Sequence, residues 1–335
     1  MNAPRCSEHD YIAFLIAAQR VYSCTEAARS QPDRQPAAPA HDAFTRLLQR
    51  NPPDTEALWQ EAQRFVRPRE GLLVLDDTTL DKPYARKMDL VTRHWSGKHR
   101  RVVSGINLQT LVWTGPSEDE SRCVIPLDVR LYEADGATKN EQFREMLAMS
   151  HERGFQPAYV LFDEWYSSLE NLKAIRTLGW RFLTRLRSNR LVNPDKKELV
   201  QISTVEIGPA GREVYLKGFG LVRVFQTEPR DGRVEYWVTN NLEMSEDERA
   251  DLSHDAWGIE NYHRSLKQYC GVERSQVRSA IGQGNHILLS VRAFLRLEVH
   301  RLRTGVSHFE AKARIVRDAL RSFLADPTLA YLPTA

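Results

Sequence analysis

Three acidic residues stand directly after short apolar segments of the chain. Asp76 and Asp77 follow the four aliphatic residues 72–75, and Asp163 ends the segment AYVLFD. An apolar run of this length predicts a buried strand, and a buried carboxylate without a partner costs several kcal/mol. These acids therefore need a partner, either a cation of the protein or a bound ion.

A fourth acid, Glu260, lies in the segment 255–269, which has the apolar spacing of an amphipathic helix. Glu260, Arg264 and Lys267 recur at i, i+4 and i+7 and so share one stripe of that helix. Cationic side chains do not bind metal ions, but they do bind phosphates. This stripe therefore combines a candidate metal ligand, the glutamate, with two candidate phosphate contacts. The apolar residues of the adjacent face are Ile259, Tyr262, Leu266 and Tyr269.

Two strand-end aspartates and one helical glutamate form a donor set that suits hard cations. Mg²⁺ prefers oxygen ligands and keeps waters that a substrate can replace. Two such ions about 3.5 to 4 Å apart stabilise the attacking and leaving oxygens of phosphoryl transfer, and Mn²⁺ accepts the same ligands. Spacing alone leaves an alternative open, because the chain has 44 acidic residues and acids at strand ends also serve in turns and ion pairs.

The composition indicates a soluble globular protein with room for about two domains. Of the 335 residues, 41% are hydrophobic, and 47 Lys and Arg nearly balance 44 Asp and Glu. The net charge of +3 excludes no class of partner, so the clustering of charge has to decide. No apolar run approaches the ~20 residues of a membrane span, and the N-terminal residues do not have the pattern expected of a signal peptide. Four scattered cysteines without a CxxC pair indicate reduced thiols in a cytosolic protein and argue against a zinc site.

The elements that position the acids alternate between helices and strands. Strands are expected from residue 72, at 158–163 and at 180–188, and the segments 100–115 and 122–134 are expected to form an antiparallel pair. Residues 190–240 have the short strands and Gly and Pro turns of a β-rich insertion. Ser167 and Glu170 have the spacing of a capping box. Helical spacing is found at 11–28, 42–49, 54–66, 140–153, up to Leu178 after that box, and in segments from 245 to the end.

This order of elements predicts a mixed α/β fold with helices packed on a sheet. Open sheets of this kind place their functional groups at strand ends. A functional site is therefore expected where Asp163 and the pair Asp76 and Asp77 end their strands.

Three segments, in this order and spacing, resemble the acidic motifs of the DDE transposases of bacterial insertion sequences. They are VLDDTTL at 74–80, VLFDEWYSS at 160–168 and WGIENYHRSLKQYCGVERSQ at 257–276. The third is the most specific, because Trp, Ile, Glu, an apolar residue and Lys all fall where the family has them. The nearest branch is the cut-and-paste group, which implies a ribonuclease-H-like mixed sheet flanked by helices and carrying a β-strand insertion. The positions in the third motif are Trp257, Ile259, Glu260, Leu266 and Lys267.

The resemblance implies a role for each acid. Asp163 matches the second catalytic acid of the family and Glu260 the third. The first is one of Asp76 and Asp77, which point to opposite faces of a strand, and the family pattern of an acid directly before Thr-Thr favours Asp77. The resemblance thus implies Asp77, Asp163 and Glu260 as catalytic residues and ligands of two Mg²⁺ or Mn²⁺ ions, with Asp76 as the alternate first ligand. Lys267 matches a lysine that contacts DNA phosphate near the transposon end.

The third motif departs from the family pattern at two positions. The family has a Tyr and an Arg seven and four residues before its glutamate, where this chain has Ser253 and Ala256. Their contacts to the DNA end are therefore missing or supplied by other residues, with Arg264 and His263 as nearby substitutes. This departure keeps an inactive copy open as an alternative.

Two basic segments are expected to contact DNA phosphates. The first, TRHWSGKHRR, surrounds Trp95 with cations, and the second, RFLTRLRSNR, alternates arginines along a strand. The alternative for both is a solvated turn or strand face. The cations expected to bind DNA in these segments are Arg93, Lys98, Arg100, Arg101, Arg185 and Arg187.

The expected protein is a transposase that cleaves and rejoins the ends of its own element. Its partners would be double-stranded DNA with terminal inverted repeats and target DNA, and the family implies a homodimer on paired ends. The alternatives are an inactive DNA-binding copy and a ribonuclease-H-like nuclease without strand transfer. Four parts are expected: helices that bind DNA or dimerise at 1–68, the first part of the catalytic core at 69–188, the insertion at 189–243, and the rest of the core with C-terminal helices at 244–335.

Overall fold

The computed structural model describes residues 5–32, 38–96, 100–116, 122–228 and 232–327. The chain forms two compact units. One consists of Asp54–Arg264, and the other of Met1–Pro53 together with Ser265–Ala335. The boundary falls inside a helix, between Arg264 and Ser265. The four-part division expected from the sequence stays a prediction.

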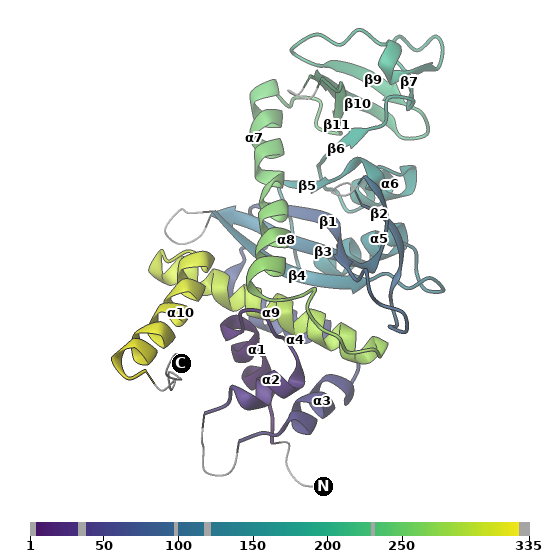
Figure 1. Cartoon of the computed structure of the whole chain (residues 1–335). Coiled ribbons are helices and arrows are strands. Elements are labelled where there is room, and N and C mark those ends of the chain that lie inside the picture. The colour runs from purple at the N-terminus through teal and green to yellow at the C-terminus, as the bar shows by residue number, and fades with distance from the viewer. Residues whose placement is uncertain (1–4, 33–37, 97–99, 117–121, 229–231, 328–335) are drawn as a thin grey trace, which may run out of the picture. The chain divides into compact units, whose positions relative to one another are not determined.

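The unit Asp54–Arg264 is built on an 11-stranded mixed sheet (Figure 1). Its strand order is β2-β3-β1-β5-β6-β11-β10-β9-β7-β8, and β4 pairs with β3. β1, β5 and β6 run parallel to one another, and the other pairings are antiparallel. The strands are β1 Leu72–Asp81, β2 Thr92–Ser96, β3 Arg101–Pro116, β4 Arg122–Leu131, β5 Tyr159–Phe162, β6 Phe182–Leu186, β7 Leu191–Asn193, β8 Val200–Gln201, β9 Arg212–Leu216, β10 Gly220–Thr227 and β11 Glu235–Thr239.

This sheet confirms the mixed α/β fold expected from the sequence and the antiparallel pairing of β3 with β4. The β-rich insertion extends the same sheet, because β11 pairs with β6 at its edge. The helices of this unit are α4 Thr55–Ala62, α5 Lys139–Glu152, α6 Leu169–Thr177, α7 Glu246–Ala256 and the first part of α8 Gly258–Tyr269, with short 3-10 turns η1 Gln63–Phe65, η2 Glu164–Tyr166 and η3 Ile202–Thr204.

Aromatic packing holds α5 against the strand that ends at the second acid. The ring of Phe143 on α5 stacks on Tyr166 at 5.5 Å and meets the ring of Phe162 edge-on at 5.1 Å. All three side chains are buried. The segment from Phe162 to Tyr166, which includes Asp163, is therefore held in place by core packing at both of its ends.

Three local expectations are wrong. The residue that caps α6 is Ser168, whose hydroxyl accepts the amide of Asn171 at 3.2 Å, because η2 intervenes after β5 and delays the helix by one residue. Ser167 instead donates to the carbonyl of Glu164 at 2.7 Å. The helix expected over 255–269 is divided at Trp257 between α7 and α8. The N-terminal helix is likewise two helices, because Ser23 caps a second one.

The other compact unit is helical. Its helices are α1 Glu8–Ala17, α2 Cys24–Arg29, α3 His41–Gln49, α9 Ala280–Thr304 and α10 His308–Ala325. α9 is buried along most of its length and forms the core of this unit. The Tyr11 hydroxyl of α1 lies 3.0 Å from Nδ1 of His286 on α9. Nδ2 of Asn285, also on α9, donates to the carbonyl of Leu48 on α3 at 2.8 Å. No helix within the described residues has an apolar stretch long enough to cross a membrane.

Candidate active site

The two adjacent aspartates lie inside β1, at the fifth and sixth of its ten residues, and not at its end. β1 continues to Asp81 because β3 pairs with it along its whole length. The parallel partner β5 pairs only with Leu72–Leu75 and ends opposite Leu75, at Phe162. Asp163 follows Phe162 directly, so it begins its loop beside Asp76. The strand that ends at this site is therefore β5. Asp76 and Asp77 lie inside β1, directly after the residue opposite which β5 ends.

Asp77 belongs to a polar cluster on one face of the sheet. Its carboxylate accepts hydrogen bonds from Lys139 Nζ at 3.0 Å, from the Tyr166 hydroxyl at 2.6 Å and from Asn107 Nδ2 at 2.5 Å. Burial alone would raise its pKa, but the charge of Lys139 and these hydrogen bonds outweigh burial and lower the pKa. Asp77 is thus a satisfied carboxylate, ionised and held by the fold.

Asp76 points to the other face, where it lines a cavity of about 310 Å³ together with Asp163 and Glu260. Burial raises the pKa of Asp76 well above its usual value, and the neighbouring charges of Asp77, Glu260 and Asp163 raise it further. The remaining lining residues of this cavity, called the carboxylate cavity below, are Val74, Leu75, Leu161, Phe162, Leu183, Arg185, Glu235, Trp237, Leu252, Ser253, Ala256, Trp257 and Ile259.

Glu260 reaches the carboxylate cavity from the first turn of α8. Ile259 and Tyr262 beside it are buried, and so is Leu266 further along, which confirms that the apolar face of this helix packs inward. Tyr269 on the same face is only partly buried. The buried face turns Glu260 outward, and its side chain is exposed.

Asp163 is occupied by a cation of the protein. Its Oδ1 accepts Nη2 of Arg185 at 2.5 Å and the amide of Glu164 at 2.7 Å. Nη1 of Arg185 pairs with Oε1 of Glu235 at 2.5 Å. Arg185 was expected to contact DNA phosphate, but in this state its guanidinium bridges two carboxylates.

The positions that depart from the family pattern, Ser253 and Ala256, line the same cavity. Among the described residues around it, Arg185 is the one Lys or Arg. The substitutes expected from the sequence do not line it: Arg264 is exposed elsewhere on α8, and His263 is buried. The guanidinium in the cavity therefore comes from β6.

The other expected DNA-binding residues that the structure describes do not line the carboxylate cavity. Arg187 is 62% exposed and lies 3.5 Å from Glu164, and Lys267 pairs with Glu273 at 2.9 Å. Four exposed side chains lie on β2, at Arg100 directly before β3, and at the start of β3, and they include the expected aromatic residue: Arg93, Trp95, Arg100 and Arg101. Lys98 lies outside the described residues. DNA contact by these residues stays a prediction.

Sequence reasoning missed Glu235 and Trp237 as members of the carboxylate cavity. They are brought there by the antiparallel pairing of β11 with β6, in which Trp237 lies opposite Arg185. The indole Nε1 of Trp237 lies 3.2 Å from Oε2 of Glu235, and its ring lies 5.6 Å from the guanidinium of Arg185. No motif in the sequence marks this register.

The donor set of the carboxylate cavity fits a divalent metal ion. Thr110 on β3 lies directly opposite Asp76 and on the same face, and its buried hydroxyl has no hydrogen-bond partner among the described residues. An unpaired buried hydroxyl on the strand partner of Asp76 is a polar group that an ordered water would satisfy. Within the described part of the chain, no three His, Cys, Asp or Glu side chains are already gathered around one point. Binding therefore requires the carboxylates to converge, and at Asp163 the metal would compete with Arg185.

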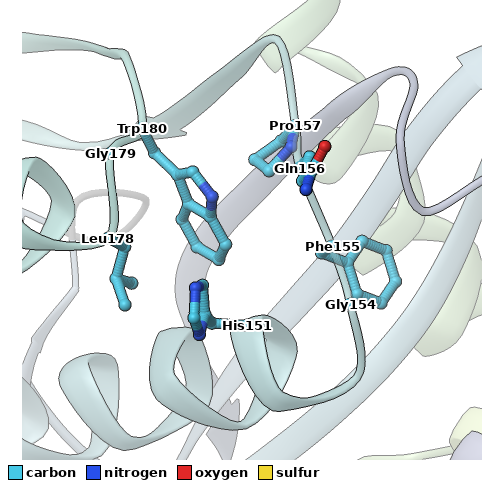
Figure 2. Close-up of a pocket in the computed structure, with 8 residues that line it drawn as sticks. All are labelled: His151, Gly154, Phe155, Gln156, Pro157, Leu178, Gly179 and Trp180. Atoms are coloured by element: carbon cyan, nitrogen blue, oxygen red, sulfur yellow. The ribbon is translucent and has the colours of Figure 1, made fainter.

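A second cavity lies at the opposite ends of β5 and β6 (Figure 2). It is about 340 Å³ in volume, and its lining includes the rings of His151 and Trp180, whose centres lie 5.9 Å apart. None of its lining residues carries a carboxylate. It offers no donor set comparable with that of the carboxylate cavity.

Comparison with known families identifies the chain. A family model described as a transposase DDE domain matches residues 67–295, a span that contains Asp76, Asp77, Asp163 and Glu260. The chain belongs to this transposase family. The transposase is accordingly an enzyme of DNA transposition, which cuts DNA and transfers strands with divalent metal ions.

The fold agrees with that of a solved transposase. A piggyBac transposase, in a synaptic complex with hairpin DNA, superposes with a TM-score of 0.52 at 11% identity, covering 98% of this chain and 74% of that chain. Endonuclease V of Bacillus subtilis, also at 11% identity, covers 80% of this chain and 93% of that chain, but its TM-score of 0.26 is too low to indicate a common fold. No curated protein matches the sequence.

The raised pKa of Asp76 predicts how the metal-free transposase responds to pH. Because the folded state keeps the Asp76 proton more tightly than the unfolded state, stability should fall as pH rises above the ordinary aspartate value of 3.8. Thermal unfolding in EDTA, at pH values from about 4 to 8, should show the wild type losing stability relative to Asp76→Asn. A difference between the two proteins that does not change with pH would contradict the raised pKa.

Proposed function

We propose that this transposase cleaves DNA at the ends of its element through a metal site formed by Asp76, Asp163 and Glu260. One observation carries the proposal: these three carboxylates line a single cavity. Asp77, preferred from the family pattern, points to the other face of β1 and is already satisfied by Lys139. The proposal therefore assigns the role of first acid to Asp76, the alternate of the sequence prediction.

The metal ions are proposed to be two Mg²⁺, with Mn²⁺ as a substitute, because an all-carboxylate donor set suits hard cations. When bound, they activate the attacking oxygen and stabilise the leaving oxygen. Asp76, Asp163 and Glu260 would bind and orient them. Leu75, Leu161 and Ile259 form an apolar part of the cavity wall beside these carboxylates.

The DNA partners are proposed to be a duplex with terminal inverted repeats and a target duplex, bound by a homodimer in the cytoplasm on nucleoid DNA. Arg93, Arg100 and Arg101 are proposed to contact phosphates near Trp95, together with Arg187. The sequence also assigns this role to Lys98, Arg264 and Lys267. Affinity that rests on phosphate contacts should fall steeply with salt.

An inactive DNA-binding copy is the second candidate. It is favoured by the absence of the family Tyr and Arg from the cavity, where Ser253 and Ala256 stand instead. A nuclease that cuts without strand transfer would share the same three carboxylates. Both differ from the proposed function in what they do to a DNA end.

A labelled duplex that joins the element end to flanking DNA tests the proposal. With Mg²⁺ or Mn²⁺, the wild type should cut at the element boundary and join the freed 3′-end to target DNA, while Glu260→Gln should do neither. Cutting without joining would indicate the nuclease. Soluble wild type that binds the duplex but never cuts it would indicate the inactive copy.

A further inference from the structure

Arg185 is the cation of the carboxylate cavity with which a metal ion would compete for Asp163. Its two terminal nitrogens hold two different acids, Asp163 and Glu235, each at 2.5 Å. The indole of Trp237, itself close to Glu235, lies 5.6 Å from the guanidinium. A planar guanidinium between two carboxylates forms the strong, charge-assisted type of hydrogen bond.

The three groups come from separate strands of the sheet. Arg185 lies on β6, Asp163 follows β5, and Glu235 begins β11 of the insertion. The side chain of Arg185 is 35% exposed and that of Glu235 25%, so the bridge is partly shielded from water. Asp163, in contrast, is 43% exposed and faces the cavity. Glu235 is thus the more buried anchor and Asp163 the more accessible partner.

We propose that Arg185 is an internal counter-ion that neutralises Asp163 in the metal-free site, and that Glu235 retains Arg185 when a divalent ion binds Asp163. This inference rests on the proposed function, because it needs a metal ion at Asp163. A guanidinium and a divalent cation repel each other and compete for the same carboxylate. The coupling between Arg185 and the metal is therefore negative: each weakens the binding of the other to Asp163.

A purely structural role for Arg185 predicts the reverse. If Arg185 only oriented Asp163 for the metal, its removal would weaken metal binding. A counter-ion, when removed, leaves Asp163 free and strengthens metal binding. The sign of the change in metal affinity therefore separates the two roles without any assay of catalysis.

The test is a Mn²⁺ titration of the full chain without DNA, read from the electron paramagnetic resonance signal of free Mn²⁺. Arg185→Gln should bind Mn²⁺ at least about fivefold more tightly than the wild type, the lower end of ordinary coupling between sites. Arg212→Gln is the matched control, because Arg212 on β9 is also 35% exposed and pairs with Asp195 at 2.9 Å. Its Mn²⁺ affinity should equal that of the wild type.

Glu235 provides a second, independent readout. In Glu235→Gln, Arg185 is left to Asp163 alone, so Mn²⁺ should bind a few-fold more weakly than in the wild type. In the Arg185→Gln background, the same change at Glu235 should have no effect, since the competitor is gone. If Glu235 were instead a metal ligand, its replacement would weaken binding in both backgrounds, a distinction that a double-mutant cycle measures.

Further outcomes separate this inference from the proposed function. Asp76→Asn and Glu260→Gln should lose Mn²⁺ binding if the metal site is assigned correctly. Mn²⁺ binding that is unchanged or weaker in Arg185→Gln would overturn the counter-ion role alone. Absence of binding in the wild type and in Arg185→Gln would overturn the metal site and the counter-ion with it. Should Arg185→Gln fail to fold, Arg185→Met, which also removes the cation but keeps an apolar side chain of similar length, should still bind Mn²⁺ more tightly than the wild type.

Discussion

Asp76→Asn should abolish DNA cleavage, with a loss of about 10³-fold or more, whereas Asp77→Asn should cleave within about tenfold of the wild type. When several catalytic residues act as a unit, replacing any one of them removes most of the rate enhancement that they provide together. Asp76 lines the carboxylate cavity with Asp163 and Glu260, while Asp77 is bound by Lys139, Tyr166 and Asn107 on the other face. The measurement is the rate of cleavage of the labelled element end under single-turnover conditions.

The control for this comparison is the stability of each variant. Asp76→Asn should unfold at the same temperature as the wild type or higher, because it removes a carboxylate that neighbouring acids repel. Loss of cleavage in a stable Asp76→Asn protein then reflects the site and not the fold. The opposite pattern, an inactive but stable Asp77→Asn beside an active Asp76→Asn, would return the role of first acid to Asp77.

Asp77→Ala should destabilise the unit that contains the sheet by about 3–5 kcal/mol. Removing one partner of a buried ion pair leaves the other charge uncompensated, and this typically costs that much. The Lys139 and Asp77 side chains are only 15% and 20% exposed, and the Tyr166 hydroxyl and Asn107 amide would lose their acceptor as well. Urea unfolding followed by tryptophan fluorescence measures the change.

Two further proteins make this prediction specific. Asp195→Ala removes a 60% exposed partner of Arg212 and should cost less than about 1 kcal/mol, as exposed ion pairs do. The double variant Asp77→Asn with Lys139→Met should recover part of the stability lost in Asp77→Ala, because no buried charge remains unpaired. An Asp77→Ala protein as stable as the wild type would contradict the structural role of this carboxylate.

Much of the fold could be predicted from the sequence, because the signals are local. The aliphatic run before Asp76 predicts β1 through its length and composition, and AYVLFD predicts β5 with Asp163 directly after it. The spacing of apolar residues on α8 likewise predicts which face of that helix is buried and leaves Glu260 outward. Each of these features depends on residues a few positions apart, so the chain itself carries the information.

The choice between Asp76 and Asp77 was decided only by tertiary structure. In the sequence the two are adjacent and chemically identical, and alternation along a strand says only that they face opposite ways. Which face carries the site depends on residues that are distant in the chain. Lys139 and Tyr166 satisfy one carboxylate from α5 and η2, and Glu260 approaches the other from α8.

The pairing of Asp163 with Arg185 could not be predicted from the sequence either. Arg185 is visible there as part of a basic segment, which predicts phosphate contact, but its partners come from the loop after β5 and from β11 of the insertion. That arrangement depends on the register of β11 against β6, a pairing across about fifty residues of chain. The sequence by itself therefore determined the family, the strands and the three acid motifs, since these are short-range patterns. Tertiary structure alone decided which aspartate enters the cavity and which cation neutralises it, because both depend on long-range strand pairing.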